Sequence, residues 1–247
     1  MSTLQIGEKE SGSIANIEPL DRVDPASQPW FAVAGANGLT MRLASANFII
    51  VSHAFFISET DAPAKRTIMV EALRLFSRKG LRETTIRDIA AAAGYSNPAL
   101  YKHFSSKDEL ALELFVACYR ECTRALDAKM SVNKSFDLRL RALVRTYTAS
   151  FDEYPDAVMF AVEHLTSFWS DVPRAMKKRT IITLIRELIE LGETEGCVPR
   201  DIDIEVRVAM VAGALGQLSR LVYLGGMSGP ASKYNDDLES TLRRALS

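Results

Sequence analysis

The chain has 247 residues, of which 47% are hydrophobic and 25% are charged, and its formal net charge is −1. This length and composition suffice for one or two globular domains with a substantial core. Three cysteines are too few for a secreted domain held by disulfides, so we expect a protein of the reducing cytosol. The near-neutral total charge gives no support for a nucleic-acid-binding protein.

The charge is unevenly distributed along the chain. Residues 63–110 carry nine basic and five acidic side chains, a balance of +4, whereas residues 1–62 carry −4 and residues 111–247 carry −1. A basic cluster alone is more often a solvated face than a binding site. It becomes a candidate contact for phosphate groups where it coincides with a nucleic-acid-binding motif.

The first 62 residues differ from the rest in composition. Residues 1–40 contain seven glycines and prolines without sustained periodicity, so we interpret residues 1–62 as a disordered or atypical N-terminal extension, or as the result of a misassigned start codon. The apolar stretch 43–57 contains Asn47 and His53 and is too short and too polar to span a bilayer roughly 30 Å thick. An export signal starting at Met41 is the alternative interpretation.

Helical patterns begin at about Ala64. Ile68, Ala72 and Phe76 form one apolar stripe, which predicts a helix over residues 64–79 that ends at Gly80. A short second helix follows, because the apolar residues between positions 86 and 93 recur at helical spacing. Either Thr84 or Thr85 is placed to cap its first amide groups.

A sharp turn and a third short helix come next. Gly94 can adopt the left-handed conformation that a turn after a helix requires, and Ser96 or Asn97 can cap the following helix. We predict that this helix covers residues 97–104. Leu100 and Phe104 lie four residues apart and face the core. Four side chains then turn at least partly toward solvent, namely Asn97, Ala99, Lys102 and His103.

This segment resembles the signature of the TetR (tetracycline-repressor) family of bacterial regulators. The resemblance rests on Ala-Gly-Tyr-Ser at 93–96, Leu-Tyr-Lys-His-Phe at 100–104 and Lys-Asp-Glu-Leu at 107–110, and Pro98 departs from the small or polar residue expected there. It implies an all-α fold. A three-helix helix-turn-helix DNA-binding domain would occupy residues 63–110, and a helical ligand-binding and dimerisation domain would occupy residues 111–247.

The resemblance also implies a partner, double-stranded DNA with a palindromic operator, whose major groove receives the helix predicted over residues 97–104. Asn97, Ala99 and Lys102 would meet base edges, since these side chains suit adenine, the thymine methyl and guanine respectively. Hydroxyl, imidazole and ammonium donors nearby would hold phosphates. His103 as a surface residue and Tyr101 as a packing aromatic are the alternatives. The expected DNA-binding set is Thr84, Thr85, Ser96, Asn97, Ala99, Tyr101, Lys102, His103 and Lys107.

The rest of the chain is predicted to be helical over residues 106–129, 138–154, 156–170, 173–195, 203–224 and 234–246. The helix over 203–224 is apolar nearly all round and must be covered on every side. The resemblance implies that the last two long helices pair with their copies in a homodimer, while the alternative is the centre of a monomeric core. The residues expected at the dimer interface are Ala209, Ala212, Gly213, Leu215 and Gly216.

A small-molecule effector between the body helices is also implied by the resemblance. Large apolar side chains with a few polar tips are typical of ligand pockets, although most such residues in a helical bundle are core. The candidate ligand-binding residues are Phe115, Tyr119, Tyr147, Phe151, Met159, His164, Phe168 and Trp169.

Other chemistry is sparse. Cys118 and Cys122 lie four residues apart, but two ligands do not make a zinc site, so we expect buried thiols and no metal. We find no nucleophile elbow, phosphate loop or dinucleotide fingerprint, and we expect neither an enzyme nor a cofactor.

The sequence thus predicts a cytoplasmic, homodimeric transcriptional repressor that a small apolar or amphipathic effector releases from DNA, with no membrane partner. One alternative is a regulator of the same fold without a small-molecule ligand. Another is an all-helical enzyme or ligand carrier whose turn motif is accidental.

Overall fold

The computed structural model describes residues 56–58 and 60–247. Within these residues the regular secondary structure is helical throughout, which confirms the predicted all-α fold. The apolar stretch 43–57 and the predicted extension 1–62 fall largely outside the described residues. None of the helices described is both long and apolar enough to cross a membrane.

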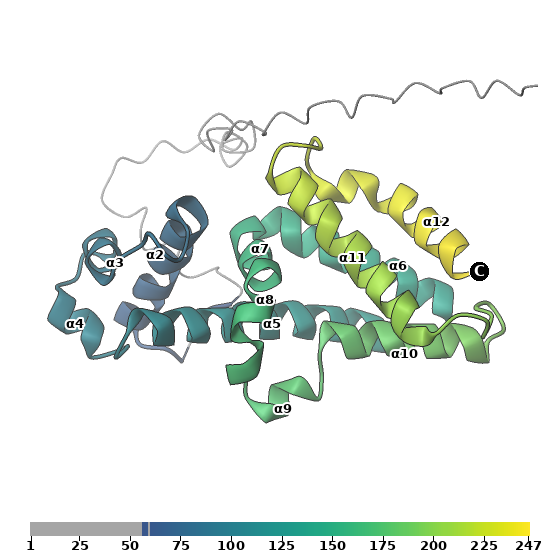
Figure 1. Cartoon of the computed structure of the whole chain (residues 1–247), viewed down its shortest axis with the longest axis horizontal. Coiled ribbons are helices and arrows are strands. Elements are labelled where there is room, and N and C mark those ends of the chain that lie inside the picture. Colours follow the sequence, from purple (N-terminus) through teal and green to yellow (C-terminus); the bar gives the residue numbers. More distant parts are fainter. Residues whose placement is uncertain (1–55, 59) are drawn as a thin grey trace, which may run out of the picture.

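The molecule is elongated, with three short helices at one end and a helical body at the other (Figure 1). The 25-residue helix α5 joins the two parts and is roughly 37 Å long at about 1.5 Å per residue. We call α2, α3 and α4 together the reader. The helices are α2 (Pro63–Lys79), α3 (Ile86–Ala93), α4 (Asn97–Tyr101), α5 (Lys107–Ser131), α6 (Phe136–Glu153), α7 (Pro155–Glu163), α8 (Leu165–Phe168), α9 (Arg174–Lys177), α10 (Ile181–Thr194), α11 (Ile204–Tyr223) and α12 (Asn235–Leu246), with 3₁₀ turns at Trp169–Asp171 and Ala231–Tyr234.

Three predicted helices are shorter or interrupted in the structure. The helix predicted over 97–104 ends at Tyr101, and the Phe104 amide bonds back to the Leu100 carbonyl in a closing turn. The helix predicted over 156–170 breaks at His164, where φ is −99° and ψ is 7°. The helix predicted over 173–195 is divided at Thr180, whose extended backbone and side chain cap α10. A local apolar period does not reveal such breaks.

Two hydrophobic cores fill the molecule, and α7 contributes to both. Phe160 belongs to the core that joins the reader to α5, and its ring stacks on that of Phe76 in α2 at 5.7 Å between centroids. Val158 and Met159 belong to the core of the body. Close packing of α7 on both sides means that a shift of this helix is felt in the reader and in the body.

Candidate nucleic-acid interface and regulatory cavity

Local hydrogen bonds and backbone conformation fix the start and the end of α3. The Thr85 hydroxyl accepts from the Asp88 amide at 3.2 Å, and the Asp88 carboxylate accepts from the Thr85 amide at 3.0 Å. This capping box starts α3, and it holds the pKa of Asp88 below its usual value. Gly94 ends α3 at φ 74°, in the left-handed region that the sequence predicted.

One side of the helix α4 packs into the core of the reader, and the opposite side is exposed. The Ser96 hydroxyl accepts from the Ala99 amide at 3.4 Å, and Leu100 and Phe104 are buried in the reader core. Tyr101 is 52% exposed, which leaves its hydroxyl and much of its ring on the surface. Lys102 is exposed beside it. The remaining predicted contacts on α4 and its turn lie partly exposed, namely Asn97, Ala99 and His103.

Two predicted phosphate contacts have a different role in the structure. Thr84 is fully buried, and its hydroxyl donates to the Gly80 carbonyl at 2.9 Å. The Lys107 ammonium donates to the carbonyls of Leu81, Arg82 and Thr84, at 2.8, 3.2 and 2.9 Å. Both side chains therefore tie the loop between α2 and α3 to its surroundings, and we remove them from the DNA-binding set.

The sequence-based assignment left out four exposed basic residues between positions 63 and 110, namely Arg78, Lys79, Arg82 and Arg87. Arg82 and Arg87 are exposed, on the loop before α3 and on α3 itself. Both contribute to the +4 balance of residues 63–110. That charge count was the available signal, but the helical pattern did not show which basic side chains reach the surface.

A small, partly open cavity lies in the body between α5, α6, α7, α8, α10 and α11. Its volume is about 130 Å³. Burial raises the pKa of Tyr147 and of Cys122 to about 12, so the tyrosine hydroxyl and the thiol are both neutral at pH 7. The cavity therefore carries no charge. Its lining residues are Tyr119, Cys122, Tyr147, Val158, Ala161, Val162, Leu165, Ile181, Ile182, Ala212, Leu215 and Gly216.

Tyr119 and Tyr147 are the two predicted ligand-binding residues that line this cavity. The Tyr147 and Ser219 hydroxyls lie 3.0 Å apart in a hydrogen bond, and burial raises the pKa of Tyr119, a rise that Thr180 and the Ile181 backbone oppose. The other six pack elsewhere, because a helical period cannot separate residues facing a void from residues facing each other. Phe151 and Met159 lie in the body core, while Phe115, His164, Phe168 and Trp169 form an aromatic cluster around α8.

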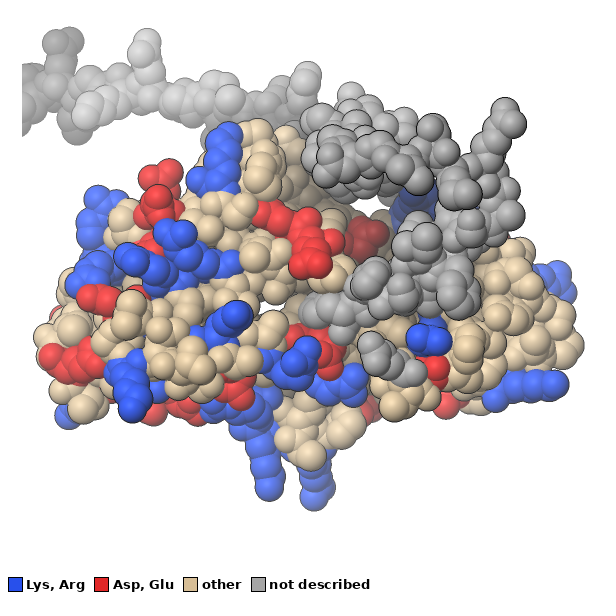
Figure 2. Space-filling view, turned by 180° about the vertical axis from the view of Figure 1, so that it is seen from behind, with Lys and Arg blue, Asp and Glu red and all other residues tan. Residues whose placement is uncertain are grey.

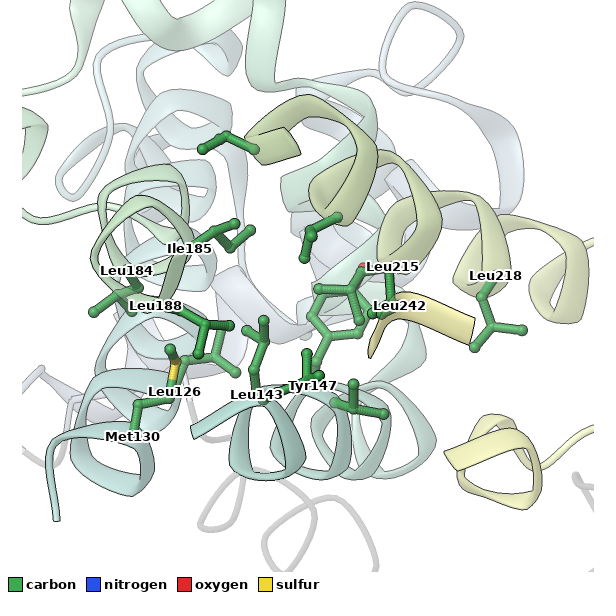
Figure 3. Packing of buried hydrophobic residues seen from close by; sticks show 14 of the residues in the cluster. Leu126, Met130, Leu143, Tyr147, Leu184, Ile185, Leu188, Leu215, Leu218 and Leu242 are labelled. Carbon is green, nitrogen blue, oxygen red and sulfur yellow. The ribbon is translucent and has the colours of Figure 1, made fainter. Parts of the chain in front are cut away.

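The predicted dimer interface is divided between two sides of α11. Leu215 is 1% exposed and meets Tyr147 inside the body, as Figure 3 shows, and Ala212 and Gly216 line the cavity with it. Leu215 is therefore corrected to an interior position, whereas Ala212 and Gly216 are partly exposed at the wall of the cavity. Ala209 and Gly213 lie on the exposed side, and nothing lies within 4 Å of a Cβ placed on Gly213.

The exposed side of α11 combines apolar residues with the exposed Gln217. Val206 is 59% exposed and Leu221 is 37% exposed, with Ala209 and Gly213 between them on the same helix face. Leu224, just beyond the helix, is 57% exposed and continues the face. Large apolar side chains gathered on one face are typical of an interface.

A polar cluster joins the reader to the body. The Tyr223 hydroxyl of α11 donates to the Asp156 carboxylate of α7 at 2.6 Å, and the nearby Ser77 side chain of α2 opposes the rise that burial causes in the pKa of both groups. Burial raises the pKa of Asp156, and the neighbouring Arg78 opposes that rise. Three helices thus meet through one carboxylate.

Comparisons with known proteins agree with this geometry. Residues 68–114 match the family described as bacterial regulatory proteins, tetR family. The HTH-type transcriptional repressor KstR2 of Rhodococcus jostii (strain RHA1) is 33% identical over 158 residues, which are 58% of this chain and 72% of that protein. The KstR2 structure from Mycobacterium tuberculosis superposes with a TM-score of 0.64 at 20% identity, covering 77% of this chain and 98% of that one.

A further solved structure has the same fold. FadR from Bacillus subtilis, solved in complex with stearoyl-CoA, superposes with a TM-score of 0.64 at 11% identity, over 73% of this chain and 98% of that chain. Taken with the KstR2 match, these similarities show that the chain belongs to the TetR family. It is a DNA-binding transcriptional regulator and not an enzyme, as the sequence predicted.

Proposed function

We propose that the protein is a homodimeric repressor, acting in the cytoplasm, that an uncharged apolar effector releases from a palindromic operator. The observation that carries the proposal is the position of α7. This helix lines the cavity with Val158 and Ala161, and it packs Phe160 against the reader. A ligand that favours one position of α7 would therefore bias the position of the reader.

The lining of the cavity supports an effector whose part inside the cavity is uncharged. Its lining is apolar apart from two tyrosine hydroxyls and one thiol, all held neutral or already hydrogen-bonded. A buried charge without a partner would be strongly disfavoured there. Two proteins of the same fold are described with molecules that have large apolar parts: KstR2 is a ketosteroid regulator, and FadR was solved with stearoyl-CoA. At about 130 Å³ the cavity would have to expand for a molecule of that size.

A second copy of the chain is the proposed partner for the exposed side of α11. An isologous dimer buries the same patch twice, and small residues at Ala209 and Gly213 permit close helix approach. The two readers of such a dimer bind two half-sites that are related by a twofold axis. The operator is therefore expected to be palindromic.

Within each reader we propose base contacts by Asn97, Ala99 and Lys102, and phosphate contacts by Thr85, Ser96, Tyr101 and His103, with the exposed Arg82 and Arg87 added to the phosphate set. Lys102→Ala should relax preference at one or two base pairs of each half-site by roughly 1–3 kcal/mol. Tyr101→Phe is its matched control, and it should weaken cognate and scrambled DNA equally. Equal losses on all sequences for Lys102→Ala would reassign that lysine to phosphate.

The effector proposal is tested in two measurements. The protein is titrated onto DNA from upstream of its own gene, and neutral cyclic and long-chain compounds are then added to the protein and to its DNA complex. A compound that raises the melting temperature and also abolishes the DNA complex identifies an inducible repressor. Ala212→Leu, which fills the cavity, should bind DNA but lose that response. DNA binding with no response to any compound would favour a regulator without a small-molecule ligand.

A further inference from the structure

A second hollow lies on a face of α5 adjacent to the one that lines the cavity. It has a volume of about 470 Å³, within the range typical of small-molecule sites. Along α5, Arg120 and Thr123 face this groove, whereas their neighbours Tyr119 and Cys122 face the cavity. We call it the α5–α9 groove. Its lining residues are Val116, Arg120, Thr123, Arg124, Asp127, Pro173, Ala175, Met176 and Arg179.

One end of the groove is closed by a fixed ion pair. The Arg179 guanidinium donates to both carboxylate oxygens of Asp127, at 2.6 and 3.1 Å, and its third nitrogen is paired with Glu187. Arg179 is therefore fully engaged and its charge is neutralised. It forms a wall of the groove and is not free to receive a ligand.

At the rim of the groove two arginines share one glutamate, unlike Arg179, which is paired with two carboxylates. Glu121, whose side chain is 13% exposed, accepts from the Nε of Arg120 at 3.1 Å and from the Nε of Arg124 at 2.6 Å. Among the described residues, the terminal nitrogens of these two arginines have no partner within hydrogen-bonding distance. One glutamate thus orients two guanidinium groups and leaves one positive charge with free donors.

The floor between the wall and the rim is apolar. Val116 of α5 and Met176 of α9 are half-buried, and Pro173 and Ala175 continue the surface. Further Lys and Arg side chains surround the projection at the lower edge of the molecule, which is the α9 segment (Figure 2). An apolar floor beside guanidinium groups with free donors matches an amphipathic anion.

We propose that the α5–α9 groove is a second ligand site, and that it takes an organic carboxylate with an apolar body. The free guanidinium donors of Arg120 and Arg124 suit a carboxylate, which can accept two hydrogen bonds from the planar donors of one arginine. The apolar body lies over Met176 and Val116, where it leaves water. This site does not depend on the proposed effector cavity.

The test uses the full chain and three probes measured by titration calorimetry at pH 7.5, namely decanoate, decanol and inorganic phosphate. Decanoate is ionised at this pH. We expect decanoate to bind, and the double variant Arg120→Gln, Arg124→Gln to weaken it by about tenfold or more, since hydrogen bonds between charged groups are lost. Arg141→Gln is the matched control, because Arg141 is also an exposed arginine paired with one glutamate, and it should leave affinity unchanged.

Two further variants separate this site from the cavity. Ala212→Leu fills the cavity and should keep decanoate binding, whereas Met176→Gln makes the floor polar and should weaken it while leaving both arginines in place. Three results would each overturn the proposal. Decanol could bind as tightly as decanoate, phosphate could bind tightly while decanoate does not bind, or Ala212→Leu could lose decanoate binding. A failed effector screen on DNA would leave this result untouched.

Discussion

Tyr223 donates a 2.6 Å hydrogen bond to Asp156, which lies 67 residues earlier in the chain. The bond connects the end of α11, whose exposed side is the proposed dimer contact, to the start of α7. Ser77 of α2 lies close enough to oppose the rise in the pKa of both groups, so this polar cluster reaches the reader, which also meets the body through the Phe76–Phe160 stack. The reader is therefore coupled to two body helices at one point.

Replacing Tyr223 by phenylalanine should weaken that coupling. We expect the free energy of unfolding to fall by about 1–2 kcal/mol, because a buried carboxylate loses one donor, and we expect the affinity for operator DNA to change as well. Tyr234→Phe is the control, since its hydroxyl bonds to the Ser228 carbonyl at 2.9 Å, remote from the reader. Denaturant unfolding and DNA titration measure both quantities. Unchanged DNA affinity in Tyr223→Phe would show that the bond is only structural.

Lys107→Met should act on the stability of the reader and not on phosphate binding. The ammonium group holds three loop carbonyls, so we expect a loss of about 1–3 kcal/mol in the free energy of unfolding. The slope of log affinity against log salt should stay the same, since no phosphate contact is removed. A slope reduced by about 1 would instead restore Lys107 to the DNA interface.

Gly213→Trp should produce monomers that fold normally. A Cβ placed at this position meets nothing within 4 Å inside the chain, and we expect a tryptophan here to strike a second copy on the exposed side of α11. Val132→Trp, at a site 73% exposed at the end of α5, is the control and should remain dimeric. Sedimentation measures the assembly. Leu215→Glu cannot serve as this test, because Leu215 is buried and its replacement would unfold the body.

His164 gives the protein a distinct response to mild acid. Burial against Phe160 lowers its pKa below 6.5, so the folded state prefers the neutral ring. As pH falls through 6.5 the unfolded chain takes up the proton first, and the free energy of unfolding decreases. Relative to His164→Gln, the native protein should therefore lose stability between pH 7 and pH 5.5. A difference that stays constant over this range would contradict the lowered pKa.

The sequence alone determined those features that depend on residues within one helical turn of each other. Local hydrogen-bond and backbone preferences predicted a cap at Thr84 or Thr85, a left-handed Gly94 and a cap at Ser96 or Asn97, and the structure has Thr85, Gly94 and Ser96 in these roles. The apolar period placed Leu100 and Phe104 in the core for the same reason. These local features carry the family resemblance, which the comparisons confirm.

Only the tertiary structure decided which side chains remain free to bind something else. Lys107 matches the family motif, but its ammonium is bound by carbonyls 23 to 26 residues away. Leu215 fits an interface helix, but α6 covers it, and six of eight predicted ligand contacts pack on other side chains. Helical periodicity gives the face of a helix, whereas the neighbour on that face depends on contacts between residues distant in sequence, which no local pattern encodes.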